Sequence, residues 1–193
     1  MRIIAGSKAR MNLLGPRDLT TRPITDRVKE SLFSILTPNH ENARVADLFC
    51  GTGSLGLEAL SRGARHAIME ERDRDALKRL RKNIAKLQFE NQTTVIATDI
   101  TRSGIVYRDI PSDIDNNRCD LVFVDPPFPL SRDVSLDSPL GKLFVKLSNQ
   151  IDRGALVVAR HARKTELLKE YARLFEQDRR EYGSMAITFL VKE

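Results

Sequence analysis

The sequence predicts an α/β fold of the doubly wound, Rossmann-like type, in which a mostly parallel sheet carries an antiparallel hairpin at its C-terminal edge. Short apolar runs alternate with helical segments along most of the 193 residues, which is typical of a parallel sheet with helices on both faces. The first run, at 45–49, leads into a glycine-rich turn, and two strand-like segments end the chain. The hydrophobic content of 41% is sufficient for the core of one compact α/β unit.

The first forty residues, 1–40, are predicted to form a basic N-terminal arm and a helix. Residues 2–5 are predicted as a short strand, and a loop rich in glycine and proline follows it. The helix begins after an N-cap at Thr25 and ends before Pro38. Its apolar face should carry four residues at helical spacing, Val28, Leu32, Ile35 and Leu36.

Strands and helices then alternate through residues 41–193, which we expect to form one compact domain. The strands are predicted at 45–49, 66–70, 93–97, 120–124 and 155–159. The helices are predicted at 54–61, 73–87, 139–149 and 164–173. Near the C-terminus, segments 174–182 and 185–191 flank Gly183 and Ser184, which favours an antiparallel hairpin.

Composition argues against several classes of protein. No apolar stretch reaches about 18 residues, so no membrane span is expected. The N-terminus lacks the apolar core of a signal peptide, which predicts a cytoplasmic protein. The two cysteines, Cys50 and Cys119, are far apart and form no CxxC pair, so we expect neither a metal site nor a redox dithiol. We expect the chain to act as a monomer.

The net charge of +6 is concentrated near the N-terminus. Segment 1–40 holds three acidic residues and seven basic ones, so four of the six excess charges lie there; the basic residues are Arg2, Lys8, Arg10, Arg17, Arg22, Arg27 and Lys29. Such an arm suits contact with the phosphate backbone of a nucleic acid. The predicted RNA contacts are Arg10, Arg22 and Arg27. The alternative is the solvated surface of a basic protein.

The residues Asp125-Pro126-Pro127-Phe128 follow directly after an apolar run and suggest chemistry on an amine. The prolines fix the backbone and remove two N–H donors, so carbonyl acceptors remain at the strand end. The exocyclic amine of a nucleobase is a poor nucleophile, and acceptors on its N–H groups favour attack as positive charge develops. Asp125 and the Pro126 carbonyl are the predicted acceptors, and Phe128 is predicted to stack on the base. The alternative is a Pro-Pro turn with Phe128 packed into the core.

A glycine-rich turn after the first strand indicates a nucleoside-containing cofactor. Its G-x-G-x-x-G spacing, which begins at Gly51 and Gly53, also occurs in dinucleotide-binding folds and does not identify the ligand. Asp47, four residues before the first glycine, opposes a polyanionic ligand and favours a cationic one. S-adenosylmethionine carries a sulfonium and an ammonium and no phosphate, so it is the predicted cofactor. Phe49 and Thr52 lie in the same stretch and belong to the predicted site.

Acids after the next two predicted strands complete the cofactor site. Glu71 lies about 20 residues past the glycine turn, where it is placed to accept hydrogen bonds from ribose hydroxyls, with Glu70 as the reserve choice. Arg72 adjoins it and is included in the predicted site. Asp99 follows the strand at 93–97 and is predicted to contact the adenine amine. The alternatives are an acid that stabilises a helix N-terminus and an ordinary turn residue.

These motifs resemble the RsmD-like family, bacterial class I S-adenosylmethionine-dependent methyltransferases that modify the exocyclic N2 of a guanine in 16S ribosomal RNA. The resemblance spans nearly the whole chain and rests on residues 2–6, 21–33, 47–64, 71–73, 83 and 125–128. The glycine turn and the Asp-Pro-Pro-Phe box are shared by many methyltransferases that act on nucleic-acid amines. The Thr-Arg-Pro stretch and the helix after the glycine turn are more specific to this family.

The resemblance implies roles for particular residues. Asp125 would be the catalytic acceptor, Phe128 the base-stacking ring and Glu71 the ribose-binding acid, while Asp47 and the loop 51–53 would hold the methionine part of the cofactor. The implied substrate is small-subunit rRNA, either free or within an assembling particle. The chain departs from the family pattern in a thinner basic run at 7–12 and in Arg160, where similar sequences place an acid after the fifth strand.

Three other functions remain compatible with parts of the sequence. An adenine-N6 methyltransferase acting on DNA or RNA would use the same box. An NAD-dependent oxidoreductase would share the glycine turn, although no hydride-transfer site is evident. A non-catalytic RNA-binding module would explain the basic arm but leaves the box without a purpose. The methyltransferase hypothesis requires the candidate residues to meet at the carboxyl ends of the strands. It also leads us to expect that the Thr-Arg-Pro loop covers the cofactor cleft.

Overall fold

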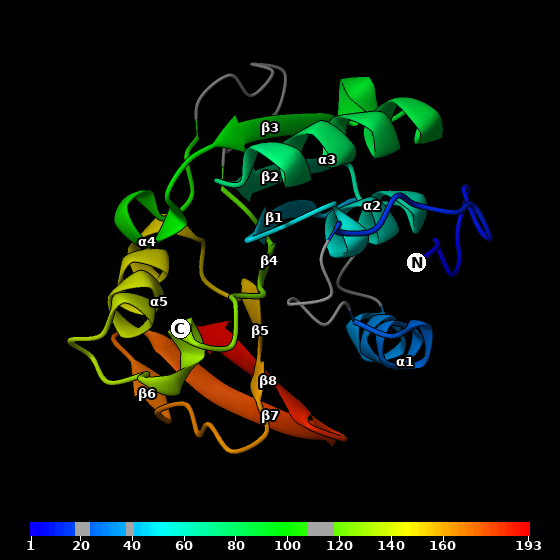
Figure 1. The fold of residues 1–193 in the computed structure, drawn as a ribbon. Helices are drawn as coiled ribbons and strands as arrows, with labels where there is room; N and C mark the ends of the chain where they lie inside the picture. The colour runs from blue at the N-terminus through cyan, green and yellow to red at the C-terminus, as the bar shows by residue number, and fades with distance from the viewer. Residues whose placement is uncertain (18–23, 38–40, 108–117) are drawn as a thin grey trace.

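The computed structural model describes residues 1–17, 24–37, 41–107 and 118–193 and contains one eight-stranded sheet in the order β3-β2-β1-β4-β5-β8-β7-β6 (Figure 1). The strands pair in parallel from β3 to β5, and the last three pair antiparallel. Their bounds are β1 Arg44–Leu48, β2 His66–Glu71, β3 Thr93–Ala97, β4 Leu121–Val124, β5 Leu156–Ala162, β6 Glu170–Tyr171, β7 Leu174–Tyr182 and β8 Met185–Lys192. The predicted fold class, including the C-terminal hairpin, is confirmed.

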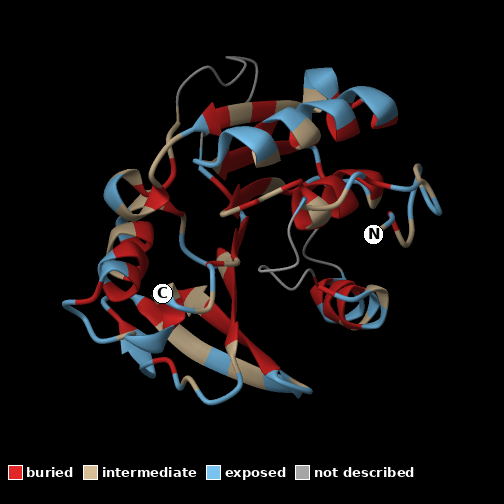
Figure 2. Cartoon of the chain, in the orientation of Figure 1, coloured by how far each residue is buried: buried red, intermediate tan, exposed pale blue. Residues whose placement is uncertain are grey.

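Helices cover both faces of the sheet (Figures 1 and 2). They are α1 Asp26–Leu36, α2 Ser54–Ser61, α3 Arg74–Leu87, α4 Ile100–Ser103 and α5 Pro139–Gln150, with two 3₁₀ turns, η1 Glu90–Gln92 and η2 Leu130–Arg132. One core joins α1, α2 and α3 to the sheet, and a second joins α4 and α5 to the other face. In β1, Val45 belongs to the first core and Ala46 to the second, because successive side chains of a strand point to opposite faces.

Helix α1 has the predicted N-cap, since the Thr25 hydroxyl accepts a hydrogen bond from the Val28 amide. Val28, Leu32 and Leu36 are buried as predicted. The prediction for Ile35 is wrong, because its side chain is 38% exposed and Phe33 is buried in its place. The buried stripe therefore follows positions 28, 32 and 36 together with 29 and 33, which is one face of a helix.

The N-terminal residues do not form a strand of the sheet. Their only β pairing among the described residues is one bridge between Arg2 and Asn12. The amides of Ile4 and Ala5 instead donate to the carboxylate of Glu58 on α2 at 2.8 and 3.1 Å. The backbone donors are satisfied by a side chain, so no strand partner is needed.

Glycine is required where this segment meets the end of α2. Gly6 has φ +85°, and a Cβ there would lie 1.8 Å from the carbonyl oxygen of Ser61. The Ser7 amide donates to the same carbonyl at 2.7 Å. Ile3 and Leu13 join the core under α1 and α2, so part of segment 1–40 shares the core of the sheet.

The predicted helix at 164–173 is wrong. The chain there runs irregularly and then forms β6, which pairs with β7. Tyr171 is buried against Phe144 of α5 at 4.8 Å between ring centroids, and its hydroxyl donates to the Val134 carbonyl at 2.8 Å. Ala172 has φ +58°, which ends any helical path. Packing of one aromatic side chain therefore overrides the helical pattern of the local sequence.

Candidate active site

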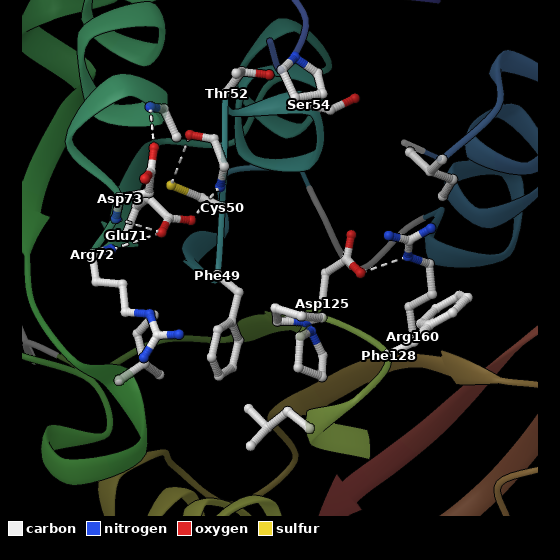
Figure 3. A pocket seen from close by; sticks show the side chains of 18 of the residues that line it. Phe49, Cys50, Thr52, Ser54, Glu71, Arg72, Asp73, Asp125, Phe128 and Arg160 are labelled. Atoms are coloured by element: carbon white, nitrogen blue, oxygen red, sulfur yellow. Dashed lines mark hydrogen bonds and ion pairs between the residues drawn. The ribbon is translucent and has the colours of Figure 1, made fainter. Parts of the chain in front are cut away.

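One cavity of about 1510 Å³ opens at the carboxyl ends of the parallel strands (Figure 3). Its walls come from the turn after β1, the end of β2, the segment after β3, the Asp-Pro-Pro-Phe box after β4, and β5. Known ligand pockets hold about 300 to 1,000 Å³. The cavity is therefore large enough for a nucleoside ligand together with a second flat group. Its lining includes Phe49, Gly51, Thr52, Glu71, Arg72, Asp99, Asp125, Pro126, Phe128 and Arg160.

Three alternate residues in the turn between β1 and α2 have left-handed backbone conformations. Phe49 has φ +61°, Gly51 has φ +55° and Gly53 has φ +90°. A Cβ on Gly53 would lie 2.5 Å from Cδ1 of Leu80, so this position requires glycine. Gly53 faces the core and does not line the cavity. Asn83 of α3 holds the turn through a 2.9 Å hydrogen bond from its side-chain amide to the Thr52 carbonyl.

Asp47 lies beneath this turn and is only 1% exposed. Its Oδ2 accepts from the Gly56 amide at 2.8 Å, while its Oδ1 has no hydrogen-bond partner among the described residues. Burial, with smaller contributions from Asp125 and Glu71, raises the pKa of Asp47 to about 7. The carboxylate is a buried, half-satisfied acceptor at the floor of the site. Asp47 itself does not line the cavity.

Glu71 connects the ends of two strands. Its Oε2 accepts from the Gly51 amide at 3.0 Å, and its Oε1 accepts from the amides of Arg72 and Asp73 at 2.8 and 2.9 Å (Figure 3). These three bonds fix the carboxylate at the cavity wall. The reserve choice, Glu70, is fully buried, and its Oε1 accepts from the Val106 amide.

Asp99 also lines the cavity, next to Ile100 and Thr101. Its Oδ1 accepts a 2.7 Å hydrogen bond from the Thr101 hydroxyl, and this bond holds the pKa of Asp99 below its ordinary value. The Asp99 side chain is therefore an anionic hydrogen-bond acceptor in the cavity wall, directly after β3.

Asp125 follows β4 directly, and its carboxylate forms an ion pair with Arg160 of β5 at 2.5 Å. Burial raises the pKa of Asp125, and the Arg160 charge opposes that shift. Pro126 is buried, whereas Phe128 is partly exposed and lines the cavity. The Arg160 guanidinium lies 5.7 Å from the centre of the Phe128 ring. Three side chains from two neighbouring strand ends therefore form one contact group (Figure 3).

Of the predicted RNA contacts, Phe128 lines the cavity, and the described arginines do not. Arg10 and Arg27 are exposed, and neither lines the cavity. Arg22 and the Thr-Arg-Pro stretch lie outside the described residues. The cationic residues that do line the cavity are Arg17, Arg72, Arg79 and Arg160. Sequence reasoning counted Arg17 in the basic arm and assigned no role to Arg79, although the excess of basic residues on α3 was a usable signal.

Three further features of the described residues concern metal sites, membrane helices and reactive cysteines. They contain no cluster of three or more His, Cys, Asp or Glu side chains that suits a metal ion. None of the helices in these ranges is both long enough and apolar enough to cross a membrane. The thiol of Cys50, beside the glycine turn, is buried, and burial raises its pKa well above the ordinary value.

Comparison with known proteins identifies the family. Residues 1–191 match the family model described as Conserved hypothetical protein 95. The chain is 30% identical over its whole length to YlbH of Bacillus subtilis (strain 168), provisionally named an rRNA methyltransferase, and covers 99% of it. It is 41% identical to Ribosomal RNA small subunit methyltransferase D of Escherichia coli (strain K12), over 66% of this chain and 60% of that protein.

Solved structures agree with the fold and the family. The yhhF protein of Escherichia coli, provisionally named a methyltransferase, superimposes with a TM-score of 0.78 at 29% identity, over 100% of this chain and 98% of that one. An RNA methyltransferase of Salinibacter ruber, solved in complex with S-adenosyl-L-homocysteine, has the same fold with a TM-score of 0.63 at 16% identity, over 89% and 94% of the two chains. The chain therefore belongs to the Conserved hypothetical protein 95 family, the RsmD family of S-adenosylmethionine-dependent methyltransferases.

Proposed function

We propose that this enzyme transfers a methyl group from S-adenosylmethionine to the exocyclic N2 amine of a guanine in small-subunit ribosomal RNA. The observation that supports this most directly is that one cavity is lined by both the glycine turn and the Asp-Pro-Pro-Phe box. A relative is named for methylation of small-subunit rRNA. An rRNA substrate implies that the enzyme works in the cytoplasm, where bacterial ribosomes are assembled.

The charges at the floor of the cavity suit a cationic cofactor. The charges of Asp125 and Glu71 both act on Asp47, and Oδ1 of Asp47 has no partner among the described residues. An ammonium or sulfonium group nearby would relieve this repulsion, whereas a phosphate would increase it. When bound, S-adenosylmethionine supplies the electrophilic methyl group. We assign its methionine part to the wall lined by Phe49, Gly51 and Thr52, with Asp47 and Gly53 in the layer directly beneath that wall.

We assign the nucleoside part of the cofactor to the residues that follow β2 and β3. Glu71 is the proposed acceptor for the ribose hydroxyls, because two of its backbone donors come from the turn that follows β2 and hold it at the wall. Arg72 lies beside it in the same wall. Asp99, whose Oδ1 accepts from the Thr101 hydroxyl, is the proposed acceptor for the adenine amine.

We place the acceptor amine of the substrate next to Asp125 in the cavity. We propose that the Asp125 carboxylate and the Pro126 carbonyl accept hydrogen bonds from its two N–H groups, so that negative charge lies where positive charge develops during attack. Phe128, partly exposed at the cavity, would stack on the guanine ring. The amine would lie behind the methyl carbon, opposite sulfur, and the enzyme contributes alignment and charge complementarity. Because a double helix buries the N2 amine, the target is an unpaired or flipped base.

The surface next to the cavity suits an RNA backbone. Helix α3 begins at the cavity, where Asp75 and Arg79 line the wall. It carries one acid and six basic residues in 14 positions, Arg74, Lys78, Arg79, Arg81, Lys82 and Lys86. All of these except Arg79 are exposed, and α3 presents an exposed outer face along its length (Figure 2). We infer that α3, with residues 12–15 beside it, contacts phosphates of the substrate.

Methylation mapping would test this function. The protein is incubated with labelled S-adenosylmethionine and with naked 16S rRNA, assembly intermediates or mature small subunits, and the methylated nucleoside is identified by mass spectrometry. We expect N2-methylguanosine at one site. Label in N6-methyladenosine would support the adenine-N6 alternative. RNA binding without label transfer on any of these substrates would support the non-catalytic RNA-binding alternative.

A further inference from the structure

Arg160 approaches Asp125 from the neighbouring strand. β4 and β5 are parallel, with Val124 opposite Ala159, so the residues that follow these two positions lie side by side. The Nε of Arg160 donates to Oδ1 of Asp125 at 2.5 Å, and the two side chains are 10% and 18% exposed. A charge-assisted bond between largely buried partners is screened less by solvent than a surface ion pair, and removing one partner is costly.

The Arg160 side chain is held on the side away from Asp125. Its backbone pairs with Ile187 of β8, so the residue belongs to a strand with a partner on each side. One of its terminal nitrogens lies 4.0 Å from the sulfur of Met185. Its guanidinium also lies 5.7 Å from the Phe128 ring, within the range of a cation–π contact. Arg160 therefore contacts both groups that we assign to the acceptor base.

The bond to Arg160 uses one oxygen of the carboxylate. No residue in the described ranges forms a hydrogen bond with Oδ2 of Asp125, and this oxygen is turned away from the guanidinium (Figure 3). The charged group that acts on the pKa of this carboxyl is Arg160 from β5, which favours the ionised form, while the Asp125 charge in turn raises the pKa of Asp47 on β1. Burial, the largest cause, opposes Arg160 and raises the Asp125 pKa.

We propose that Arg160 is a positioning residue for methyl transfer: it anchors Oδ1 of Asp125 and the face of Phe128, so that only Oδ2 is presented to the acceptor amine. The inference rests on the proposed function, because it takes Asp125 and Phe128 as the groups that bind the base. Without the guanidinium, the carboxylate would rotate freely and would be protonated over a wider pH range. A protonated carboxyl group carries no negative charge with which to stabilise the developing positive charge on the amine.

Two substitutions separate the charge of Arg160 from its shape. Arg160→Met removes the charge and keeps a long side chain, whereas Arg160→Lys keeps the charge and loses the planar group that stacks on Phe128. Two measurements are made on the wild type and on both variants. One is the titration of the Asp125 carboxyl carbon by ¹³C nuclear magnetic resonance, assigned by comparison with Asp125→Asn. The other is kcat against pH, together with the Kd for S-adenosylhomocysteine.

For Arg160→Met we expect the Asp125 pKa to rise by at least one unit. We expect kcat to fall more than tenfold near neutral pH and to recover partly at higher pH, with an unchanged Kd for S-adenosylhomocysteine. Arg160→Lys should keep the wild-type pKa of Asp125 and lose only a few-fold in kcat. An unchanged Asp125 titration in Arg160→Met would overturn the inference, as would an equal loss of kcat in both variants without a shift of the pH profile.

The titration also separates this inference from the proposed function. It needs no RNA, so it still decides the role of Arg160 if the wild type methylates no guanine. Thermal unfolding of each variant identifies a loss that comes from misfolding. If Arg160→Met does not fold, the inference is tested by the Asp125 titration and the pH profile of Arg160→Lys. A shifted Asp125 pKa in Arg160→Lys would contradict the inference.

Discussion

Lys29 of α1 and Glu58 of α2 form an ion pair in the protein interior, with 3.2 Å between Nζ and Oε2 and side-chain exposures of 1% and 0%. Lys29 also donates to the Arg2 carbonyl at 2.6 Å, and Glu58 also accepts from the Ile4 amide. The pair therefore joins α1, α2 and the N-terminal segment at a single point. This contact holds residues 2–4 against α1 and α2, and Met1 and Arg17 from the same part of the chain line the cavity.

Glu58→Gln should destabilise the fold strongly. It leaves the Lys29 ammonium buried without a counter-charge, a change that typically costs about 3 to 5 kcal/mol. The free energy of unfolding is measured by chemical denaturation. Asp75→Asn is the matched control, because its partner Lys78 is exposed and the 3.5 Å pair should contribute less than about 1 kcal/mol. Equal losses in the two variants would show that burial of the first pair is unimportant.

Asp125→Ala should nearly abolish turnover while it preserves cofactor binding. Loss of one positioned acceptor for developing charge typically lowers kcat by about 10² to 10³. Single-turnover methyl transfer gives the rate, and calorimetry with S-adenosylhomocysteine gives the affinity. A loss of affinity in parallel with the loss of rate would mean that Asp125 serves the cofactor and not the acceptor amine.

Cofactor binding should release a proton from Asp47. The pKa of this group is raised to about 7, mainly by burial, and a cation placed against it favours the ionised form. At a pH of about 6, up to about one proton should be released when S-adenosylmethionine binds. Calorimetry in two buffers of different ionisation enthalpy measures the release. Asp47→Asn should abolish it, and an identical release in that variant would exclude Asp47 as the source.

The raised pKa of Asp47 should also make the stability of the cofactor-free protein depend on pH. The folded-state pKa of about 7 lies above the unfolded value of about 3.9, so the protonated form favours folding. The stability that Asp47 contributes is therefore complete below a pH of about 4 and is lost as the pH rises to about 7. Denaturation curves of the wild type and Asp47→Asn should diverge over this window. Parallel stability profiles would contradict the raised pKa.

Charge reversal on α3 should weaken RNA binding. Arg74, Arg81 and Lys82 are exposed and form no ion pair within the described ranges. Replacing all three by Glu should reduce affinity and lower the salt slope of binding by about 2, since each lost phosphate contact on single-stranded RNA contributes about 0.7. Filter binding at several salt concentrations measures both quantities.

A matched control for this change lies elsewhere on the surface. Lys142, Arg153 and Arg173 are also exposed, do not line the cavity, and can be replaced by Glu to give the same change in net charge. We expect this triple variant to bind RNA nearly as well as the wild type. Similar losses in the two triple variants would mean that overall charge, and not the surface of α3, determines affinity.

The sequence by itself determined three features: the alternation of strands with helices, the glycine turn after β1, and the Asp-Pro-Pro-Phe box after β4. These features are local: apolar runs specify buried strands, the space and φ at Gly53 require glycine, and the two prolines restrict φ and remove backbone donors. Because parallel strands place their carboxyl ends at one edge, the sequence also predicted that Glu71 and Asp125 would meet at one cavity, and they do.

Tertiary structure decided the contacts between residues that are far apart in the chain. The pair of Arg160 and Asp125 depends on the register of β4 and β5, which neither segment specifies alone. The docking of the N-terminal segment on Glu58 and the burial of Tyr171 in place of a helix are likewise packing events. Local propensity differs by less than about 1 kcal/mol per residue, whereas burying one large aromatic side chain contributes about 1.5 to 3 kcal/mol, which favours the packed strand at Tyr171 over a helix.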